Sequence, residues 1–251
     1  MADLSGLVVV VTGGNGGIGL GMATAVAEAG ADVVIWGRNG DKNAAAEAEL
    51  RATGRRVLAL ECDVSDEQQI IDAFAASVAA MGKVDSLFAN AGIGGYAPFV
   101  DMSLAEWRRV QAVNLDGVFL SLREAARHLV ERGEGGSLIG VSSTSAIHGA
   151  PGMEHYASAK AGVTALIRSC AVELARHKIR CNTILPGWTE SGMLDPSTSS
   201  PTFIENTTKR TPVRRWGVPA DLGPAAVFLA DPTNLFHTGD QLVVDGGYTV
   251  F

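Results

Sequence analysis

The chain has 251 residues, a net charge of −7 and an apolar fraction of 47%, with 30 glycines and only 6% aromatic residues. This balance is typical of a well-buried α/β protein with many tight turns and excludes an intrinsically disordered chain. The negative charge gives nucleic-acid binding no electrostatic support, and apolar runs such as Leu7–Val11 are far shorter than the roughly 20 residues of a membrane helix.

Short β-rich runs alternate with longer helical patterns along the whole chain. Such alternation predicts an α/β fold, a Rossmann-like doubly wound parallel sheet of seven strands with helices on both faces. We expect one domain over residues 1–251. The predicted strands are Leu7–Val11, Asp32–Trp36, Arg56–Glu61, Ser86–Asn90, Ser137–Ser142, Ile179–Leu185 and Gln241–Asp245.

Local signals mark the ends of several helices between these strands. Ser65 with Gln68, and Ser103 with Glu106, have the spacing of capping boxes at helix starts. Glycines that favour helix ends follow three of the helical patterns, at Gly30, Gly54 and Gly82.

A glycine-rich turn, Thr12–Gly19, directly follows the first strand and opens an Ala-rich helix. Glycines allow the backbone to approach a pyrophosphate, which then faces the amides at the start of the helix. Two registers fit: Gly14, Gly16 and Gly19 match one dinucleotide-binding spacing, whereas Gly13, Gly17 and Gly19 match another. The spacing alone does not choose between them.

The turn after the second strand indicates which dinucleotide binds. A carboxylate there would hold the ribose 2′-hydroxyl of NAD, and an arginine suits the 2′-phosphate of NADP. The turn carries Arg38, and the nearby Asp41 has the position of a helix cap rather than of a ribose ligand. NADP(H) is therefore expected, with NAD(H) as the alternative.

Tyr156 and Lys160 lie four residues apart at the head of a long helical pattern, so they share one face of the helix. A phenol is a poor proton shuttle at neutral pH until a nearby cation lowers its pKa, and Lys160 can provide that cation. Ser143 follows the fifth strand, where its hydroxyl can bind a substrate oxygen. Hydride exchange between nicotinamide and a carbonyl or alcohol carbon fits this chemistry.

With these pieces in order, the chain resembles the short-chain dehydrogenase/reductase family in its compact single-domain form. The resemblance covers nearly the whole chain. The matching motifs are Thr12–Gly19, Asp63, Asn90–Gly92, Asn114, Ser143, Tyr156 with Lys160, and Pro186–Gly187.

This resemblance implies a catalytic tetrad in which Tyr156 passes the proton, Ser143 positions the substrate oxygen, Lys160 binds the nicotinamide ribose, and Asn114 holds a relay water. By the same resemblance, Asp63 and Val64 would contact adenine, and Asn90 would lie by the adenosine ribose. The residues expected to bind the cofactor are Gly13, Asn15, Gly17, Ile18, Gly19, Arg38, Asp63, Val64, Asn90, Ala91, Gly92, Tyr156, Lys160, Pro186, Gly187, Thr189 and Ser191.

Residues 188–216 break the alternation, being rich in Thr, Ser and Pro without a clear period. Long irregular insertions in compact domains are often functional, so we expect a substrate lid here, the alternative being a disordered surface loop. Expected pocket walls are Ser145, His155, Trp188 and Met193.

The remaining expectations concern the setting of the protein. Cys62, Cys170 and Cys181 show no paired spacing, so reduced buried thiols and no metal site are expected. The N-terminus lacks a signal-peptide pattern, which favours a cytoplasmic protein. The resemblance implies a homotetramer. Two alternatives to a carbonyl reductase stay open: an NAD(H)-linked sugar or polyol dehydrogenase, and a non-catalytic dinucleotide sensor.

Overall fold

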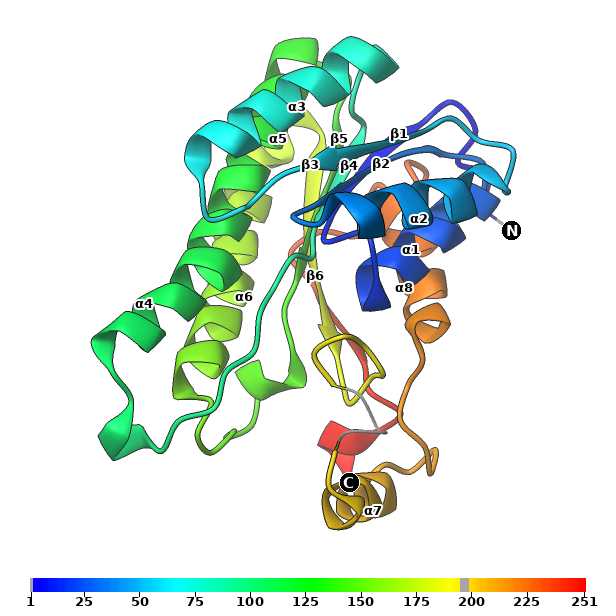
Figure 1. Ribbon diagram of the computed structural model, residues 1–251. Helices are drawn as coiled ribbons and strands as arrows, with labels where there is room; N and C mark the ends of the chain where they lie inside the picture. Colours follow the sequence, from blue (N-terminus) through cyan, green and yellow to red (C-terminus); the bar gives the residue numbers. More distant parts are fainter. Residues whose placement is uncertain (1, 195–198) are drawn as a thin grey trace.

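The computed structural model describes residues 2–194 and 199–251, and within them seven strands form one parallel sheet (Figure 1). The strand order is β3-β2-β1-β4-β5-β6-β7, which confirms the doubly wound arrangement. The strands are β1 (Val8–Thr12), β2 (Asp32–Gly37), β3 (Val57–Glu61), β4 (Ser86–Ala89), β5 (Gly136–Val141), β6 (Ile179–Pro186) and β7 (Gln241–Val244).

The sheet centre is built from strands that are apolar on both faces. Every residue of β1 is buried, and β1 pairs with β2 on one side and β4 on the other. A strand covered by helices above and below has no solvent face, so it shows a continuous valine run rather than alternation. The chain order reverses at β1, where the crossover moves from β3 back to β4.

Helices cover both faces, as Figure 1 shows. On one face lie α1 (Gly17–Glu28), α2 (Gly40–Arg51) and α8 (Gly223–Ala230); on the other lie α3 (Glu67–Met81), α5 (Gly117–Arg132) and α6 (Glu154–Leu174). Each face has its own apolar core, one including Met22, Ile35 and Leu229, the other Trp36, Leu87 and Ile167.

Helix starts follow the sequence signals with two corrections. Ser103 caps α4 (Leu104–Gln111) by accepting from Glu106 N at 3.1 Å, as expected. The start of α3 is capped by Asp66 rather than Ser65, because the Asp66 carboxylate accepts two backbone N–H groups. At α2 the cap is Asn39, and Asp41 lies inside the first turn instead.

Between α4 and α5 the helix continues through a π-helical turn, Ala112–Asp116. A π-turn inserts one extra residue into a helix and often marks a functional position. Asn114 lies in this turn and is fully buried. The turn therefore displaces Asn114 from the position that a regular helix would give it.

The predicted irregular segment, residues 188–216, contains a helix, α7 (Pro201–Arg210). Ser200 caps α7 by accepting from Phe203 N, and Pro201 takes the first helical position, where its missing N–H costs nothing. The expectation of a wholly irregular segment was thus wrong, and residues 195–198 of it lie outside the described residues. In Figure 1, α7 lies beside the C-terminus.

Within residues 2–194 and 199–251, no helix has both the length and the apolar character needed to cross a membrane. The same residues contain no group of three or more His, Cys, Asp or Glu side chains arranged to hold a metal ion. All three cysteines are free; Cys62 and Cys181 are buried as expected, whereas Cys170 is only partly buried.

Candidate active site

The four predicted catalytic residues meet beyond the carboxyl ends of the central strands. Ser143 follows β5, Tyr156 and Lys160 lie in the first two turns of α6, and Asn114 comes from the π-turn. In an open parallel sheet this edge is where ligands bind. The fold thus brings residues from three separate parts of the chain to one place.

Tyr156 and Lys160 face one another along α6, with the lysine ammonium 5.6 Å from the centroid of the phenol ring. Lys160 is only 3% exposed, and its Nζ donates to the carbonyl oxygen of Val141 at 2.8 Å. Burial lowers the pKa of Lys160 to about 8. Burial also raises the pKa of Tyr156, while a side-chain hydrogen bond with Ser143 opposes that rise. The hydrogen bond with Ser143 therefore acts to lower the phenol pKa.

Asn114 reaches the site through the loop after β4. Its side chain accepts from Ile93 N and donates to Ile93 O, both at 2.8 Å. A Cβ added to Gly92 would lie 3.1 Å from Asn114 Oδ1 and 3.5 Å from Lys160 Nζ, so Asn114 and Lys160 both border the space over Gly92. Only a residue without a side chain keeps this space open.

The glycine turn forms a cradle with the register Gly13, Gly17 and Gly19. Gly13 and Gly17 have φ values of +65° and +50°, which disfavour any side chain. A Cβ on Gly19 would clash with the carbonyl oxygen of Gly13, whereas one on Gly16 would meet open space. Ile18, the second residue of α1, packs partly buried against the core beneath this turn.

The start of α1 has the properties of an anion site. Within the described chain no side chain caps this helix, and its first turn holds no acidic residue. Its first amides and dipole are therefore open to a phosphate. Together with the glycine cradle, this fits the diphosphate of a dinucleotide.

Asn90 supports that cradle with its side chain. Its Nδ2 donates to the carbonyl oxygens of Thr12, at 2.9 Å, and Gly13, at 3.4 Å. Thr12 Oγ1 in turn accepts from the backbone N–H groups of Asn90 and Ala91. These bonds tie the ends of β1 and β4 together and hold the backbone of the turn in place.

Arg38, which follows β2, lies beside Asp63, which follows β3. The two side chains are 61% and 31% exposed, and their closest nitrogen and oxygen atoms are 3.6 Å apart. Partial burial acts to raise the pKa of Asp63. Hydrogen bonds from Ser65 and the charge of Arg38 outweigh this effect and hold the pKa below its ordinary value. Val64 is buried against Gly117. Arg38 is thus reachable, although it already has a loose partner.

The segment after β6 reaches the glycine turn at Gly17. Pro186 ends β6, and Gly187 packs against Asp245, with its N–H bonded to Val244 O. Thr189 is buried and donates to Gly187 O at 3.1 Å. A Cβ on Gly17 would lie 3.1 Å from Ser191 Cβ. Ser191 therefore borders the glycine cradle, and Pro186, Gly187 and Thr189 lead the chain to it from the end of β6.

The predicted pocket walls are only partly brought together. Met193, 41% exposed, lies against Gly94, and Ser145 donates its N–H to Ser143 Oγ at 3.1 Å. His155 is fully buried, so it lies behind the site and is not an exposed wall. Trp188 packs in an aromatic cluster with α7 and the C-terminal turn, including Phe203 at 5.0 Å between ring centroids, Trp216 and Tyr248.

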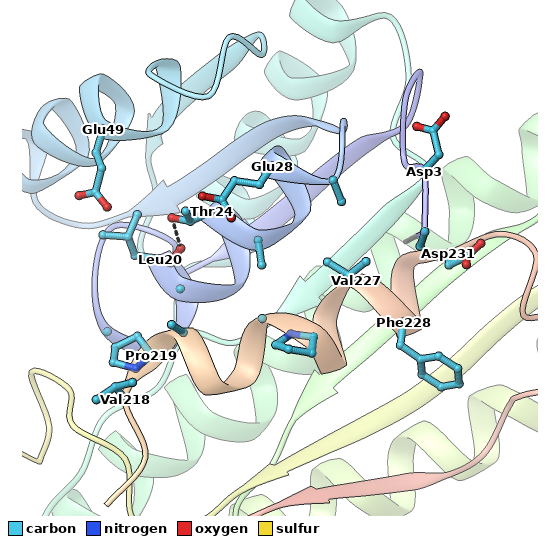
Figure 2. Close-up of a pocket in the computed structure, with 18 of the residues that line it drawn as sticks. Asp3, Leu20, Thr24, Glu28, Glu49, Val218, Pro219, Val227, Phe228 and Asp231 are labelled. Atoms are coloured by element: carbon cyan, nitrogen blue, oxygen red, sulfur yellow. Dashed lines mark hydrogen bonds between the residues drawn. The ribbon is translucent and has the colours of Figure 1, made fainter.

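A groove of about 1260 Å³ lies outside this site, between α1 and α8 (Figure 2). Apolar residues such as Leu20, Val227 and Phe228 line it, and Glu28 and Asp231 border it. Of the predicted site residues, only Gly17 is among the described residues that line the groove. The groove is therefore a separate surface feature.

Sequence reasoning missed two groups of residues. Asn43 accepts from Asn15 Nδ2 at 2.6 Å and donates to the carbonyl oxygens of Gly37 and Leu60, which fixes the Asn15 side chain beside the end of β2. Glu106 and Arg109 lie behind Tyr156 in contact with His155 and Gly94. The sequence gives no signal for these contacts, because Asn15 and Asn43, like Glu106 and His155, are distant in sequence.

Comparison with known proteins agrees with this geometry. A family model described as enoyl-(acyl carrier protein) reductase matches residues 13–249. The chain is 40% identical over 251 residues to an L-rhamnose 1-dehydrogenase (NAD(P)(+)) from Sphingomonas sp. (strain SKA58), covering 100% of this chain and 99% of that protein.

Solved structures give the same result. A short-chain type dehydrogenase/reductase from Mycobacterium marinum has a TM-score of 0.93 at 34% identity, covering 98% of this chain and 97% of its own. A gluconate 5-dehydrogenase from Burkholderia cenocepacia J2315, in complex with NADP and tartrate, has a TM-score of 0.94 at 35% identity, covering 99% and 97%. The chain therefore belongs to the short-chain dehydrogenase/reductase family of NAD(P)-dependent oxidoreductases.

Proposed function

We propose that the protein is an NADP(H)-dependent carbonyl reductase and alcohol dehydrogenase in which Tyr156 is the general acid and base. The observation that carries the proposal is the pairing of the half-buried Tyr156 and Ser143 with the buried Lys160 at the carboxyl edge of the sheet. When bound, the nicotinamide supplies the hydride in reduction and takes it up in oxidation.

The chain's own residues handle the proton. In reduction, the Tyr156 O–H bond breaks and its proton passes to the substrate oxygen, which Ser143 holds by a hydrogen bond. In oxidation, Tyr156 takes the alcohol proton back. Because burial raises the pKa of Tyr156, the phenol keeps its proton at neutral pH and is ready to act as an acid.

Lys160 and Asn114 support this transfer. Lys160 Nζ has three donors and Val141 O accepts one of them, so the others are available for the nicotinamide ribose and for stabilising the phenolate. Asn114 borders the same space over Gly92 and would hold a relay water. The proton route to solvent thus begins at the buried lysine.

The remaining predicted residues would hold the dinucleotide. The cradle of Gly13, Gly17 and Gly19 would receive the diphosphate, with Asn15 and Ile18 at the start of α1, and Arg38 would pair with the 2′-phosphate. A guanidinium matches phosphate geometry with two parallel hydrogen bonds. The Burkholderia relative was solved in complex with NADP, which supports the proposal of NADP(H) for this chain.

Absorbance of reduced nicotinamide near ~340 nm, followed with a panel of carbonyls and alcohols, tests the proposal. Tyr156→Phe should lower kcat by roughly 100-fold or more, because proton transfer contributes about that much to the rate. NADPH binding, measured by fluorescence, should stay within about twofold of wild type, since the substitution leaves the cradle intact. Unchanged turnover in Tyr156→Phe would refute the role of the phenol.

A second candidate, a sugar or polyol dehydrogenase that also accepts NAD(H), is favoured by the relatives. The Sphingomonas protein is named for L-rhamnose and for both cofactors, and the Burkholderia protein for gluconate. The exposure of Arg38 is compatible with this alternative. Turnover of L-rhamnose or gluconate at equal rates with NAD⁺ and NADP⁺ would select it.

Three further features stay predictions: a homotetramer, a cytoplasmic location, and a lid over the substrate in residues 188–216. The contact of Met193 with Gly94 supports the lid, because it brings this segment to the loop beside the tetrad. Light scattering coupled to size-exclusion chromatography measures the oligomeric state, and cell fractionation the location.

A further inference from the structure

A network of polar and charged side chains lies at the start of the helix that carries Tyr156. His155 precedes Tyr156 in α6 and is 0% exposed. Its Nε2 is 3.5 Å from Glu106 Oε1 of α4, and Glu106 binds Arg109 through two bonds of 2.8 Å. Arg109 also donates to the carbonyl oxygen of Gly94 at 3.1 Å.

His155 provides a hydrogen-bond acceptor for a backbone N–H group at the start of α6. No side chain among the described residues caps α6 at its N-cap, Met153. The N–H of Tyr156, in the first turn, is one of the amides that a helix start leaves without a partner, and His155 Nδ1 accepts it at 2.9 Å. Gln111 Nε2 holds the same residue from outside, donating to His155 O at 2.8 Å.

These bonds fix the proton position on the imidazole. In a neutral imidazole one nitrogen accepts and the other donates. Since Nδ1 accepts the Tyr156 N–H, the proton belongs on Nε2, which faces the Glu106 carboxylate. At 3.5 Å this contact is longer than a good hydrogen bond, so it orients the ring by charge more than by a short bond.

The second arm of the network holds the wall of the site. A hydrogen bond with Arg109 lowers the pKa of Glu106, and one with Glu106 raises the pKa of Arg109, so both stay ionised. Gly95 leaves no spare room here: its added Cβ would clash with Glu106 Oε1 and lie 2.9 Å from His155 Nε2. Ile93, which precedes Gly94, is hydrogen-bonded to the side chain of Asn114.

We propose that His155, Glu106 and Arg109 are positioning residues that fix the first turn of α6 relative to the Gly94–Gly95 loop, so that the Tyr156 phenol meets the substrate oxygen held by Ser143. The network connects the loop bonded to Asn114 with the first turn of the tyrosine helix. Misplacement of a reacting group by about 1 Å can cost roughly 100-fold in rate. The inference rests on the proposed role of Tyr156.

Two substitutions at His155 separate positioning from simple packing. Asn places its Oδ1 where His155 has Nδ1, so His155→Asn keeps an acceptor for the Tyr156 N–H. His155→Leu has no acceptor and leaves that buried amide unpaired. We expect His155→Leu to lower kcat by about 10- to 100-fold and His155→Asn to recover to within about threefold of wild type. NADPH affinity should change less than about twofold in both.

Glu106→Gln gives an independent test in case His155→Leu does not fold. It keeps the shape of the side chain and removes its charge, and we expect kcat to fall by about three- to tenfold. Glu47→Gln is the matched control, because Glu47 pairs with Arg51 on α2 with similar exposure, 25% and 61%, against 28% and 50% for Glu106 and Arg109. It should leave kcat unchanged.

The outcomes distinguish this inference from the proposed function. Wild-type kcat in both His155→Leu and Glu106→Gln, or equal losses in His155→Leu and His155→Asn, overturns the positioning role. A lowered melting temperature with unchanged kcat also overturns it, because that is the signature of packing alone. If Tyr156→Phe retains wild-type turnover, the proposed function itself fails, whatever the His155 variants do.

Discussion

The two ends of the candidate site are built differently. At the catalytic end, Lys160 is 3% exposed and Asn114 is fully buried, and each is bonded to backbone groups. At the adenosine end, the Arg38 and Asp63 side chains are 61% and 31% exposed and meet only at 3.6 Å. The fold therefore fixes the side chains proposed to transfer the proton, whereas those proposed to choose between NADP and NAD are exposed and can be exchanged at little cost to stability.

The largest effect is expected from Lys160→Met. Removing the ammonium should lower kcat by at least about 100-fold, because the proton route loses its first group. The native pKa of Lys160 is lowered from 10.5 to about 8 by burial, so the unfolded chain binds this proton more readily than the folded one. Stability then rises with pH between about 8 and 10.5, and the charged lysine costs about 3 kcal/mol at pH 7.

Unfolding measurements check this sign. The lost hydrogen bond to Val141 O offsets part of the gain, so we expect Lys160→Met to be more stable than wild type at pH 7 by at most about 3 kcal/mol. The difference should shrink as the pH rises from 8 to 10.5. Lys42→Met, at an exposed position, is the control. A variant that is less stable than wild type at pH 7 would contradict the buried charge.

A smaller effect is expected at the adenosine end. Arg38→Ala should weaken NADPH binding by about 10- to 100-fold, because a hydrogen bond to a charged group contributes about 1.5–3 kcal/mol. NADH affinity should stay within about twofold. Titration of both cofactors measures the ratio, with Arg127→Ala, an equally exposed arginine, as the control. Equal losses for both cofactors would show that Arg38 does not read the 2′-phosphate.

The smallest effect is expected from Asp63→Asn. This change frees Arg38 from its partner, and exposed ion pairs contribute only about 0.2–1 kcal/mol, so NADPH should bind up to about fivefold more tightly. The gain should decrease with added salt. Weaker binding of NADPH and NADH alike would indicate that the carboxylate itself holds the adenosine.

Sequence patterns predicted the sheet well, and the reason is local. Each of the seven strands begins and ends within one residue of its predicted limits, because Val- and Ile-rich runs end at glycines and polar turns. Helix starts were less certain where two acceptors adjoin, as at Ser65 and Asp66. The ten residues of α7 were missed because Thr and Pro favour other conformations and only capping by Ser200 opens the helix.

The candidate site was predictable where a motif is local and not where it depends on tertiary contacts. Tyr156 and Lys160 share a helix face by spacing alone. The sequence could not show that His155 lies behind the site, since its partner Glu106 belongs to another helix. It also could not choose the glycine register, which depends on the contacts of Gly13 with Asn90 and Ala91 and of Gly17 with Ser191.

The π-turn at Ala112–Asp116 has a consequence for the tolerance of this region to insertions and deletions. An α-helix turns by about 100° per residue, so one extra residue shifts the phase of everything that follows it. Deleting a single residue here would turn the continuous segment from α4 through α5 into a regular α-helix. The apolar side of α5 would then rotate away from the sheet, so the length of this turn is as constrained as its amino acids.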